Sequence, residues 1–234
     1  MPSGERYHLV LVDSPLELVP EALWKGKDVR NDAKRRGRGP GEILLDISKH
    51  YSSMKRFDLL DGRGRPDIVH TTLLTALDSP LNQMGRLRTY VHTVEDTVIR
   101  VDRHTRLPRS YERFEGLLAK LLMVGHIPDE EPYLLSVHQA TLPDLLRELA
   151  LDTVVALSRR GGPVPIHQVL SRLSGRDMAF MVGAFQKGAF SPRVRALAHR
   201  VVSLGPYPLS THVAVCKVLH EVEVFLRSGA AAGI

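Results

Sequence analysis

Cysteine is almost absent from this 234-residue chain, in which Cys216 is the only one. A single thiol excludes an internal disulfide and a thiolate metal site, so nothing indicates an oxidising compartment. Long apolar runs are also lacking, and none approaches the roughly 20 residues that a membrane-spanning helix requires. The N-terminal apolar run at 9–12 is closed by Asp13 and Pro15 and is too short for a signal peptide. We therefore expect a cytosolic chain with no membrane segment.

Several catalytic signatures are missing as well. There is no Gly-x-x-x-x-Gly-Lys-Ser/Thr phosphate loop, no Gly-x-Ser-x-Gly elbow and no His-Glu-x-x-His zinc motif. No Gly-x-Gly-x-x-Gly follows the first predicted strand, which weighs against an ordinary Rossmann nucleotide binder. The 11 histidines include no close ligand pair, because His212 and His220 lie two helical turns apart. We expect no metal site.

Lysine and aromatic residues are scarce, and both shortages bear on whether and how the chain would bind nucleic acid. Lysine accounts for only 8 of the 32 basic residues, and the other 24 are arginine, in a chain of net charge +6. Arginine offers planar, bidentate donors, which favours nucleic-acid binding over diffuse solubilising charge. Genomic composition or heat adaptation would also explain this bias. The aromatic content of 6% argues against a platform that stacks many bases, so RNA would be held mainly by its backbone.

Apolar periodicity predicts strands that alternate with helices along one domain, residues 1–234. Strands are expected at 7–12, 87–93, 97–102, 133–138, 153–157, 179–182 and within 195–204. Helices are expected at 42–57, 67–77, 110–124, 142–149, 166–173 and 209–227. The charged stretch 25–41 is expected to be a loop. Alternation of this kind predicts an α/β fold, with helices packed on the faces of a sheet.

A glycine-rich basic loop leads into the predicted helix at 67–77. Gly62 and Gly64 free the backbone, and Pro66 suits the first helical position. Asp67 would then orient Arg65 at the positive end of the helix, an arrangement that suits gripping a phosphate or a base edge. From the residues alone, a solvated basic loop with a helix cap is an equally good interpretation.

Two late strands end in loops of bare backbone. Residues 183–188 read Gly-Ala-Phe-Gln-Lys-Gly, and residues 205–210 read Gly-Pro-Tyr-Pro-Leu-Ser. Loops at the carboxyl edge of a parallel sheet are where ligands of such folds usually bind. From the residues alone, ordinary strand-to-helix turns are the favoured interpretation of both loops.

Three motifs resemble the ribosomal RNA pseudouridine N1-methyltransferases of the SPOUT (α/β-knot) superfamily. They are Arg-Pro-Asp-Ile-Val-His at 65–70, Asp-Ser-Pro-Leu-Asn at 78–82 and Tyr-Val-His-Thr at 90–93. The resemblance covers about residues 44–225. It implies an α/β knot with a deep C-terminal trefoil knot, a rare exception to the rule against threaded loops. It also implies a family-specific, basic RNA-binding insertion at about 26–66, with the knot and cofactor site at about 153–228.

The resemblance also implies which residues form the site. S-adenosyl-L-methionine would be held by Leu157, Gly183, Gly188, Leu204, Gly205, Pro206, Tyr207, Pro208 and Leu209. RNA would be contacted by Arg65, Arg106, Arg109 and Arg113. Arg65 and Asp67 would be the catalytic pair, with Asp67 holding Arg65 beside the reacting base.

The function implied is methylation of N1 of a pseudouridine in small-subunit ribosomal RNA during ribosome biogenesis. A homodimer is expected, with ribosomal proteins or a pre-ribosomal particle as further candidate partners, in the cytoplasm or, in a eukaryote, the nucleolus. Two alternatives stay open: a non-catalytic RNA-binding ribosome-assembly factor, and a SPOUT methyltransferase that acts on another RNA base, such as uridine N3 or a tRNA base. Cofactor binding separates the first alternative from the enzyme, and the methylated base separates the second.

Overall fold

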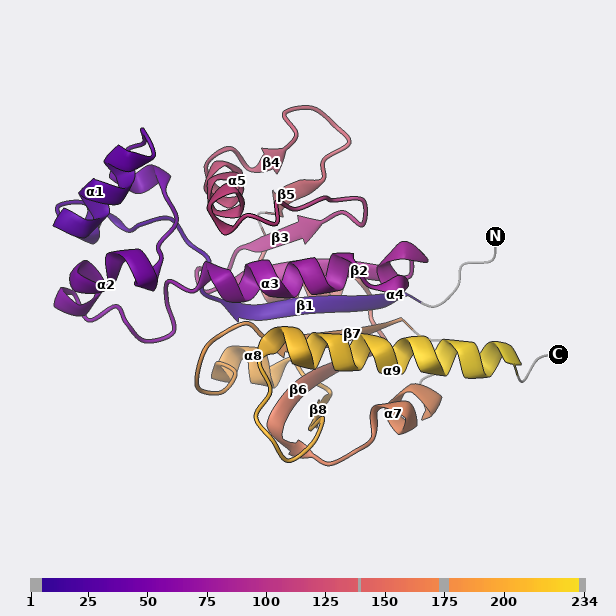
Figure 1. The fold of residues 1–234 in the computed structure, drawn as a ribbon. Helices are drawn as coiled ribbons and strands as arrows, with labels where there is room; N and C mark the ends of the chain where they lie inside the picture. The colour runs from indigo at the N-terminus through magenta and orange to yellow at the C-terminus, as the bar shows by residue number, and fades with distance from the viewer. Residues whose placement is uncertain (1–5, 139, 173–176, 232–234) are drawn as a thin grey trace.

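One mixed sheet runs through the molecule. The computed structural model describes residues 6–138, 140–172 and 177–231. Within them the strand order is β4-β5-β3-β2-β1-β7-β6-β8 (Figure 1). The strands are β1 (Tyr7–Ser14), β2 (Leu87–Thr93), β3 (Val98–Val101), β4 (His126–Ile127), β5 (Leu135–His138), β6 (Thr153–Gly162), β7 (Met178–Gly183) and β8 (Arg200–Val202). Neighbours from β2 to β8 pair in parallel, and β3, β5 and β4 extend the sheet in antiparallel pairing.

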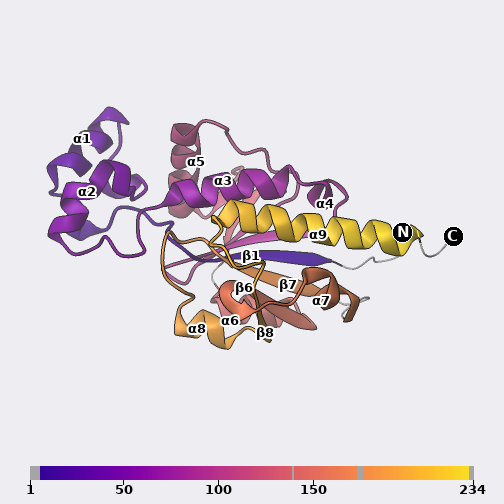
Figure 2. The same ribbon diagram turned by 60° about the horizontal axis from the view of Figure 1, so that its bottom comes forward.

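Helices cover both faces of this sheet, which confirms the predicted α/β class. They are α1 (Lys27–Arg35), α2 (Ile47–Arg56), α3 (Pro66–Leu77), α4 (Pro80–Gln83), α5 (Tyr111–Val124), α6 (Leu142–Glu148), α7 (Ile166–Arg172), α8 (Pro192–Ala196) and α9 (Thr211–Ala231). Helices α3 and α9 lie side by side along one face (Figure 1). Helices α6 and α8 lie on the opposite side of the sheet (Figure 2).

The central strands are apolar on both faces because helices bury both. In β1, Leu9 and Leu11 belong to a core that includes side chains of α3, α5 and α9. Val10 and Val12, which point the other way, pack into a second core with residues of α6 and α8. Successive side chains of β1 therefore point into two different cores. A strand that is buried on both faces is expected to have a near-continuous apolar sequence.

The prediction of a loop at 25–41 is wrong, because residues 27–35 form helix α1. Val29 and Ala33, four residues apart, bury one face of this helix in a third hydrophobic core with Leu23 and Met54. Seven of its nine residues are polar or charged, in the sequence Lys-Asp-Val-Arg-Asn-Asp-Ala-Lys-Arg, so this short apolar face is hard to see in the sequence. We call residues 17–64, which carry α1 and α2, the extension; α1 and α2 lie to one side of the sheet (Figure 1).

Other predicted boundaries shift for identifiable reasons. The helix expected at 42–57 begins at Ile47, because Asp46 caps it by accepting a hydrogen bond from Ser48 N at 2.8 Å. The strand expected within 195–204 is confirmed as β8, which follows the end of α8 at Ala196. Leu173, the last residue of the helix expected at 166–173, lies outside the described residues.

Buried ion pairs join the extension to α5. The carboxylate of Glu115, only 2% exposed, accepts a hydrogen bond from Arg36 Nη2 at 2.8 Å and another from Lys49 Nζ. Tyr111 OH donates to Asp46 Oδ2 at 2.8 Å. Removing one partner of such a buried pair leaves an uncompensated charge, so these contacts fix where the extension sits.

The loops at the carboxyl edge of the sheet hydrogen-bond to the end of β1. Ala184 N donates to Val12 O at 3.0 Å, which attaches the loop after β7. Arg65 N donates to Pro15 O at 3.3 Å, which attaches the loop before α3. The loop after β7 and the loop before α3 are therefore both attached to the end of β1, at the edge where ligands of parallel sheets usually bind.

The buried His8 of β1 is expected to make the protein less stable at low pH. Its ring is 4% exposed, stacks on Tyr90 at 6.0 Å, and has no hydrogen-bond partner at either nitrogen among the described residues. Burial lowers the pKa of His8 from 6.5 to about 4, so between these values the unfolded chain binds the proton and the folded one does not. The contribution of neutral His8 to the free energy of unfolding is complete above the unfolded pKa. As the pH falls towards 4, this contribution decreases by about 3 kcal/mol.

Unfolding by urea, followed between pH 7 and pH 4, measures this dependence. We expect His8→Phe to lose that share of it, whereas His104→Gln, at an exposed histidine, should keep the wild-type curve. A wild-type pH dependence in His8→Phe would contradict the assignment.

Candidate active site

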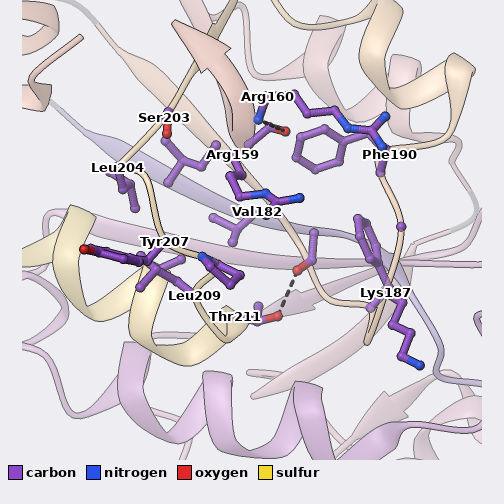
Figure 3. Close-up of a pocket in the computed structure, with 18 of the residues that line it drawn as sticks. Arg159, Arg160, Val182, Lys187, Phe190, Ser203, Leu204, Tyr207, Leu209 and Thr211 are labelled. Atoms are coloured by element: carbon purple, nitrogen blue, oxygen red, sulfur yellow. Dashed lines mark hydrogen bonds between the residues drawn. The ribbon is translucent and has the colours of Figure 1, made fainter. Parts of the chain in front are cut away.

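A pocket of about 410 Å³ opens at the carboxyl edge of the sheet, within the usual range for small-molecule sites (Figure 3). Its walls are the end of β6, the loop from β7 to α8 and the loop from β8 to α9. Eight predicted cofactor residues line it: Leu157, Gly183, Gly188, Leu204, Gly205, Tyr207, Pro208 and Leu209. Pro206, the ninth, is not among the lining residues.

Both loops present bare backbone to this pocket. Gly188 and Gly205 have positive φ angles of +111° and +144°, and a Cβ on either would enter open space. Ser203 Oγ donates to Gly205 O at 2.8 Å, which fixes the turn. Thr211 Oγ1 donates to Gly183 O at 2.9 Å and ties the start of α9 to the end of β7 (Figure 3). The site therefore offers backbone groups beside the apolar side chains of Leu157 and Leu209.

A hydrogen-bonded chain fixes the far end of the loop after β7. Asp13 Oδ2 accepts from Ser191 N at 2.9 Å, and Asp13 N donates to His92 Nδ1 at 3.3 Å. Because Nδ1 accepts, Nε2 of His92 carries the hydrogen and donates to Asp96 Oδ1 at 2.9 Å. Burial lowers the pKa of His92, which favours this neutral form. Asp96 also accepts from Arg193 Nη1 of α8 at 2.7 Å.

Sequence reasoning missed the arginines at the end of β6. Leu157 and Gly162 both pair with Val202, so residues 158–161 leave the regular ladder as a bulge. A Cβ on Gly161 would lie 2.6 Å from the carbonyl carbon of Val202, so only glycine permits this close approach. The bulge places Arg159 and Arg160 on the wall of the pocket. The register with Val202 depends on a strand 40 residues later, which local sequence does not reveal.

Arg65 and Asp67 form the pair expected from the sequence. Arg65 Nε and Nη2 donate to the two carboxylate oxygens of Asp67, each at 2.7 Å. The hydrogen bonds from Arg65 to Asp67 raise the pKa of Arg65, so its guanidinium stays charged. Arg65 remains 24% exposed and Asp67 45% exposed, which leaves the planar group accessible from solvent. Neither residue lines the pocket of its own chain.

Tyr111 and Asp46 lie close to this pair. Burial raises the pKa of Tyr111, so its hydroxyl stays a neutral donor to Asp46. Burial opposes ionisation of Asp46, but hydrogen bonds from Ser48 and Tyr111 outweigh it and hold the pKa of this carboxyl below its ordinary value. The Tyr111 hydroxyl therefore joins α5 to the cap of α2.

The predicted RNA-contacting arginines, Arg106, Arg109 and Arg113, are all exposed. Arg109 is 88% exposed, and its Nη2 lies 3.8 Å from Asp78 Oδ2. The backbone next to Arg109 is held in place by His70. Its Nε2 donates to Pro108 O at 2.8 Å, and its ring stacks on Phe114 at 4.3 Å. His70 thus joins the arginine segment to α3, the helix that begins beside Arg65.

The described residues contain no group of three or more His, Cys, Asp or Glu side chains that could hold a metal ion. No helix among them is both long and apolar enough to span a bilayer.

The chain is similar to known proteins over most of its length. A family model described as EMG1/NEP1 methyltransferase matches residues 9–223. Ribosomal RNA small subunit methyltransferase Nep1 of Staphylothermus marinus is 39% identical over 220 residues, covering 94% of this chain and 96% of the relative. The Nep1 of Pyrococcus furiosus is 40% identical over 220 residues, with 94% and 97% covered.

A solved structure agrees with these matches. Archaeoglobus fulgidus Nep1 bound to S-adenosylhomocysteine superposes with a TM-score of 0.83 at 37% identity, covering 96% of this chain and 99% of that one. The family and the SPOUT-type α/β-knot fold expected from the motifs are thereby confirmed. This chain belongs to the EMG1/NEP1 methyltransferase family.

Proposed function

We propose that this protein is an S-adenosylmethionine-dependent methyltransferase that modifies N1 of a pseudouridine in small-subunit ribosomal RNA. The observation that carries the proposal is the pocket between the loops after β7 and β8. Its relative from Archaeoglobus fulgidus is described as bound to S-adenosylhomocysteine, which is what S-adenosylmethionine becomes once its methyl group has been transferred.

The residues of the pocket fit such a cofactor. Leu157, Leu204 and Leu209 supply apolar walls for a purine, and the loops around Gly188 and Gly205 supply backbone donors and acceptors. When bound, S-adenosylmethionine supplies a methyl group on a positively charged sulfur. The chain's own contribution is to fix that group in place and to exclude water around it.

The charge and position of Arg65 suit contact with the base that would receive the methyl group. Pseudouridine is joined to ribose through carbon, so its N1 carries a hydrogen that must be lost on methylation. Negative charge then builds on the ring carbonyls, and a charged guanidinium held flat by Asp67 would stabilise it. A base in a single-stranded loop can be turned out to reach this group.

The proposal includes a homodimer. Arg65 and Asp67 do not line the pocket of their own chain, so one RNA loop would contact this pair in one protomer and the cofactor pocket of its partner. Exposed Arg106, Arg109 and Arg113 would hold the flanking backbone. Light scattering at working concentrations should therefore give twice the mass of one chain, and a strict monomer that is fully active would contradict this part.

Methyl transfer to defined RNA loops tests the proposed function. The protein is incubated with methyl-labelled S-adenosylmethionine and two loops that differ only in pseudouridine or uridine at one position. We expect label in the pseudouridine loop alone, at N1 by mass mapping. Label at another base would favour a different target, and RNA binding without any cofactor binding would favour a non-catalytic assembly factor.

Gly188→Val tests the assignment of the pocket. The added side chain strains a backbone at φ +111° and fills the space where a ligand would meet bare backbone. We expect affinity for S-adenosylhomocysteine to fall by more than about tenfold in calorimetry. Gly37→Val is the matched control, since Gly37 also has a positive φ of +61° and open space around its Cβ but lies in the extension. Equal cofactor affinity in both folded variants would contradict the assignment.

Arg65→Ala and Asp67→Asn should damage the same step. Because Asp67 holds Arg65 by two hydrogen bonds, we expect each variant to slow single-turnover methyl transfer by about 10- to 100-fold, and the double variant to lose less than the sum. Affinity for S-adenosylhomocysteine should change little. Arg65→Lys should rescue poorly, because an ammonium cannot make a planar, two-pronged contact.

A purely structural role for Asp67 gives a different result. As an acid in the first turn of α3 it would contribute up to about 1 kcal/mol of stability and nothing to turnover. Glu112→Gln, which removes an acid from the first turn of α5, is the control for that effect. Normal turnover in a destabilised Asp67→Asn protein would rule out the catalytic role.

A further inference from the structure

Three cations surround the cofactor pocket without acidic partners. Arg159, Arg160 and Lys187 line it, and none of the other described lining residues is Asp or Glu. Within the described part of the chain, none of the three side chains forms an ion pair. By contrast, Arg193 on nearby α8, Arg36 and Arg63 of the extension, and Arg65 at the start of α3 all pair with carboxylates. These unpaired charges are available to a ligand.

The bulge in β6 is what holds two of these cations in place. Residues 158–161 project because Leu157 and Gly162 share one partner, Val202, and Ser203 N donates to Gly162 O at 3.0 Å to close the bulge. Arg160 N also donates to Ser158 Oγ at 3.3 Å. Figure 3 shows Arg159 extending across the pocket, with Tyr207 and Leu209 on one side and Lys187 and Phe190 on the other.

The charge of the cofactor does not account for these residues. S-adenosylmethionine carries an ammonium, a sulfonium and a carboxylate, so its net charge is positive. Three unpaired cations around it raise the free energy of the bound state through repulsion, which solvent weakens but does not abolish. A wall with this charge suits an anion that arrives together with the cofactor.

We propose that Arg159, with Arg160 and Lys187, binds a backbone phosphate of the RNA beside the target nucleotide, directly over the cofactor pocket. The inference rests on the proposed function and adds a second RNA contact to it, apart from Arg106, Arg109 and Arg113. A phosphodiester matches the planar donors of arginine and neutralises the repulsion that the cofactor meets. RNA therefore tightens cofactor binding. S-adenosylhomocysteine, which lacks the sulfonium charge, meets less repulsion than S-adenosylmethionine.

RNA affinity measured across a range of salt concentrations is the first readout. Arg159→Ala and Arg159→Ala/Lys187→Ala are compared with wild type, using a pseudouridine-containing loop. Each lost phosphate contact should weaken binding several-fold and reduce the slope of log affinity against log salt by about 0.7 to 1. Arg159→Lys keeps the charge and should keep most of the slope. Arg172→Ala, at an exposed arginine of α7 that lines no described pocket, should match wild type.

Calorimetry without RNA is the second readout and identifies the anion. If the cations face RNA, Arg159→Ala should bind S-adenosylmethionine as well as wild type or about two- to threefold better, and its preference for S-adenosylhomocysteine should narrow. Equal losses of affinity for both cofactor forms, with the wild-type salt slope, would show that Arg159 holds the cofactor's own carboxylate and would overturn the proposal.

Wild-type controls keep this result separate from the proposed function. If the wild type binds cofactor and methylates the pseudouridine loop while all variants keep its salt slope and cofactor affinities, only the phosphate site is refuted. If the wild type neither binds cofactor nor transfers methyl groups, the proposed function itself fails.

Discussion

The parallel pairing of β7 with both β1 and β6 is the constraint on which the site depends. It places the carboxyl ends of three buried strands at one edge, and every wall of the pocket starts within a few residues of that edge. Two side-chain contacts carry the pairing into the loops: Thr211 Oγ1 to Gly183 O, and Asp13 to Ser191. The bare backbone of Gly188 is therefore anchored at both ends of its loop, which pre-organises it for a ligand.

Ion pairs and hydrogen bonds attach the extension to α5. The buried carboxylate of Glu115 accepts hydrogen bonds from Arg36 and Lys49, and the Tyr111 hydroxyl donates to Asp46. Helix α5 therefore holds both helices of the extension. The loop that delivers Arg65 runs from the extension into α3 and bonds back to Pro15 at the end of β1. The proposed RNA surface and the proposed cofactor pocket are thereby both attached to the end of β1.

Much of this was predictable from the sequence where a short segment determines its own structure. The core strands were visible as apolar runs, the pocket loops as glycine and proline after strands, and the Arg65–Asp67 pair as a basic residue placed before a helix start. Helix α1 was missed because only Val29 and Ala33 mark its buried face. The Arg159 bulge was missed because it is created by pairing with distant Val202. Of the nine predicted cofactor residues, Pro206 alone does not line the pocket.

Hydrogen–deuterium exchange tests most directly that a cofactor pocket and a separate RNA surface meet at one edge of this sheet. S-adenosylhomocysteine should slow exchange of amides at 183–190 and 203–210, where bare backbone faces the pocket. Adding a pseudouridine-containing loop should further slow exchange at 62–68 and 106–113. Protection by the cofactor confined to other segments, or RNA protection that bypasses both arginine regions, would contradict the account.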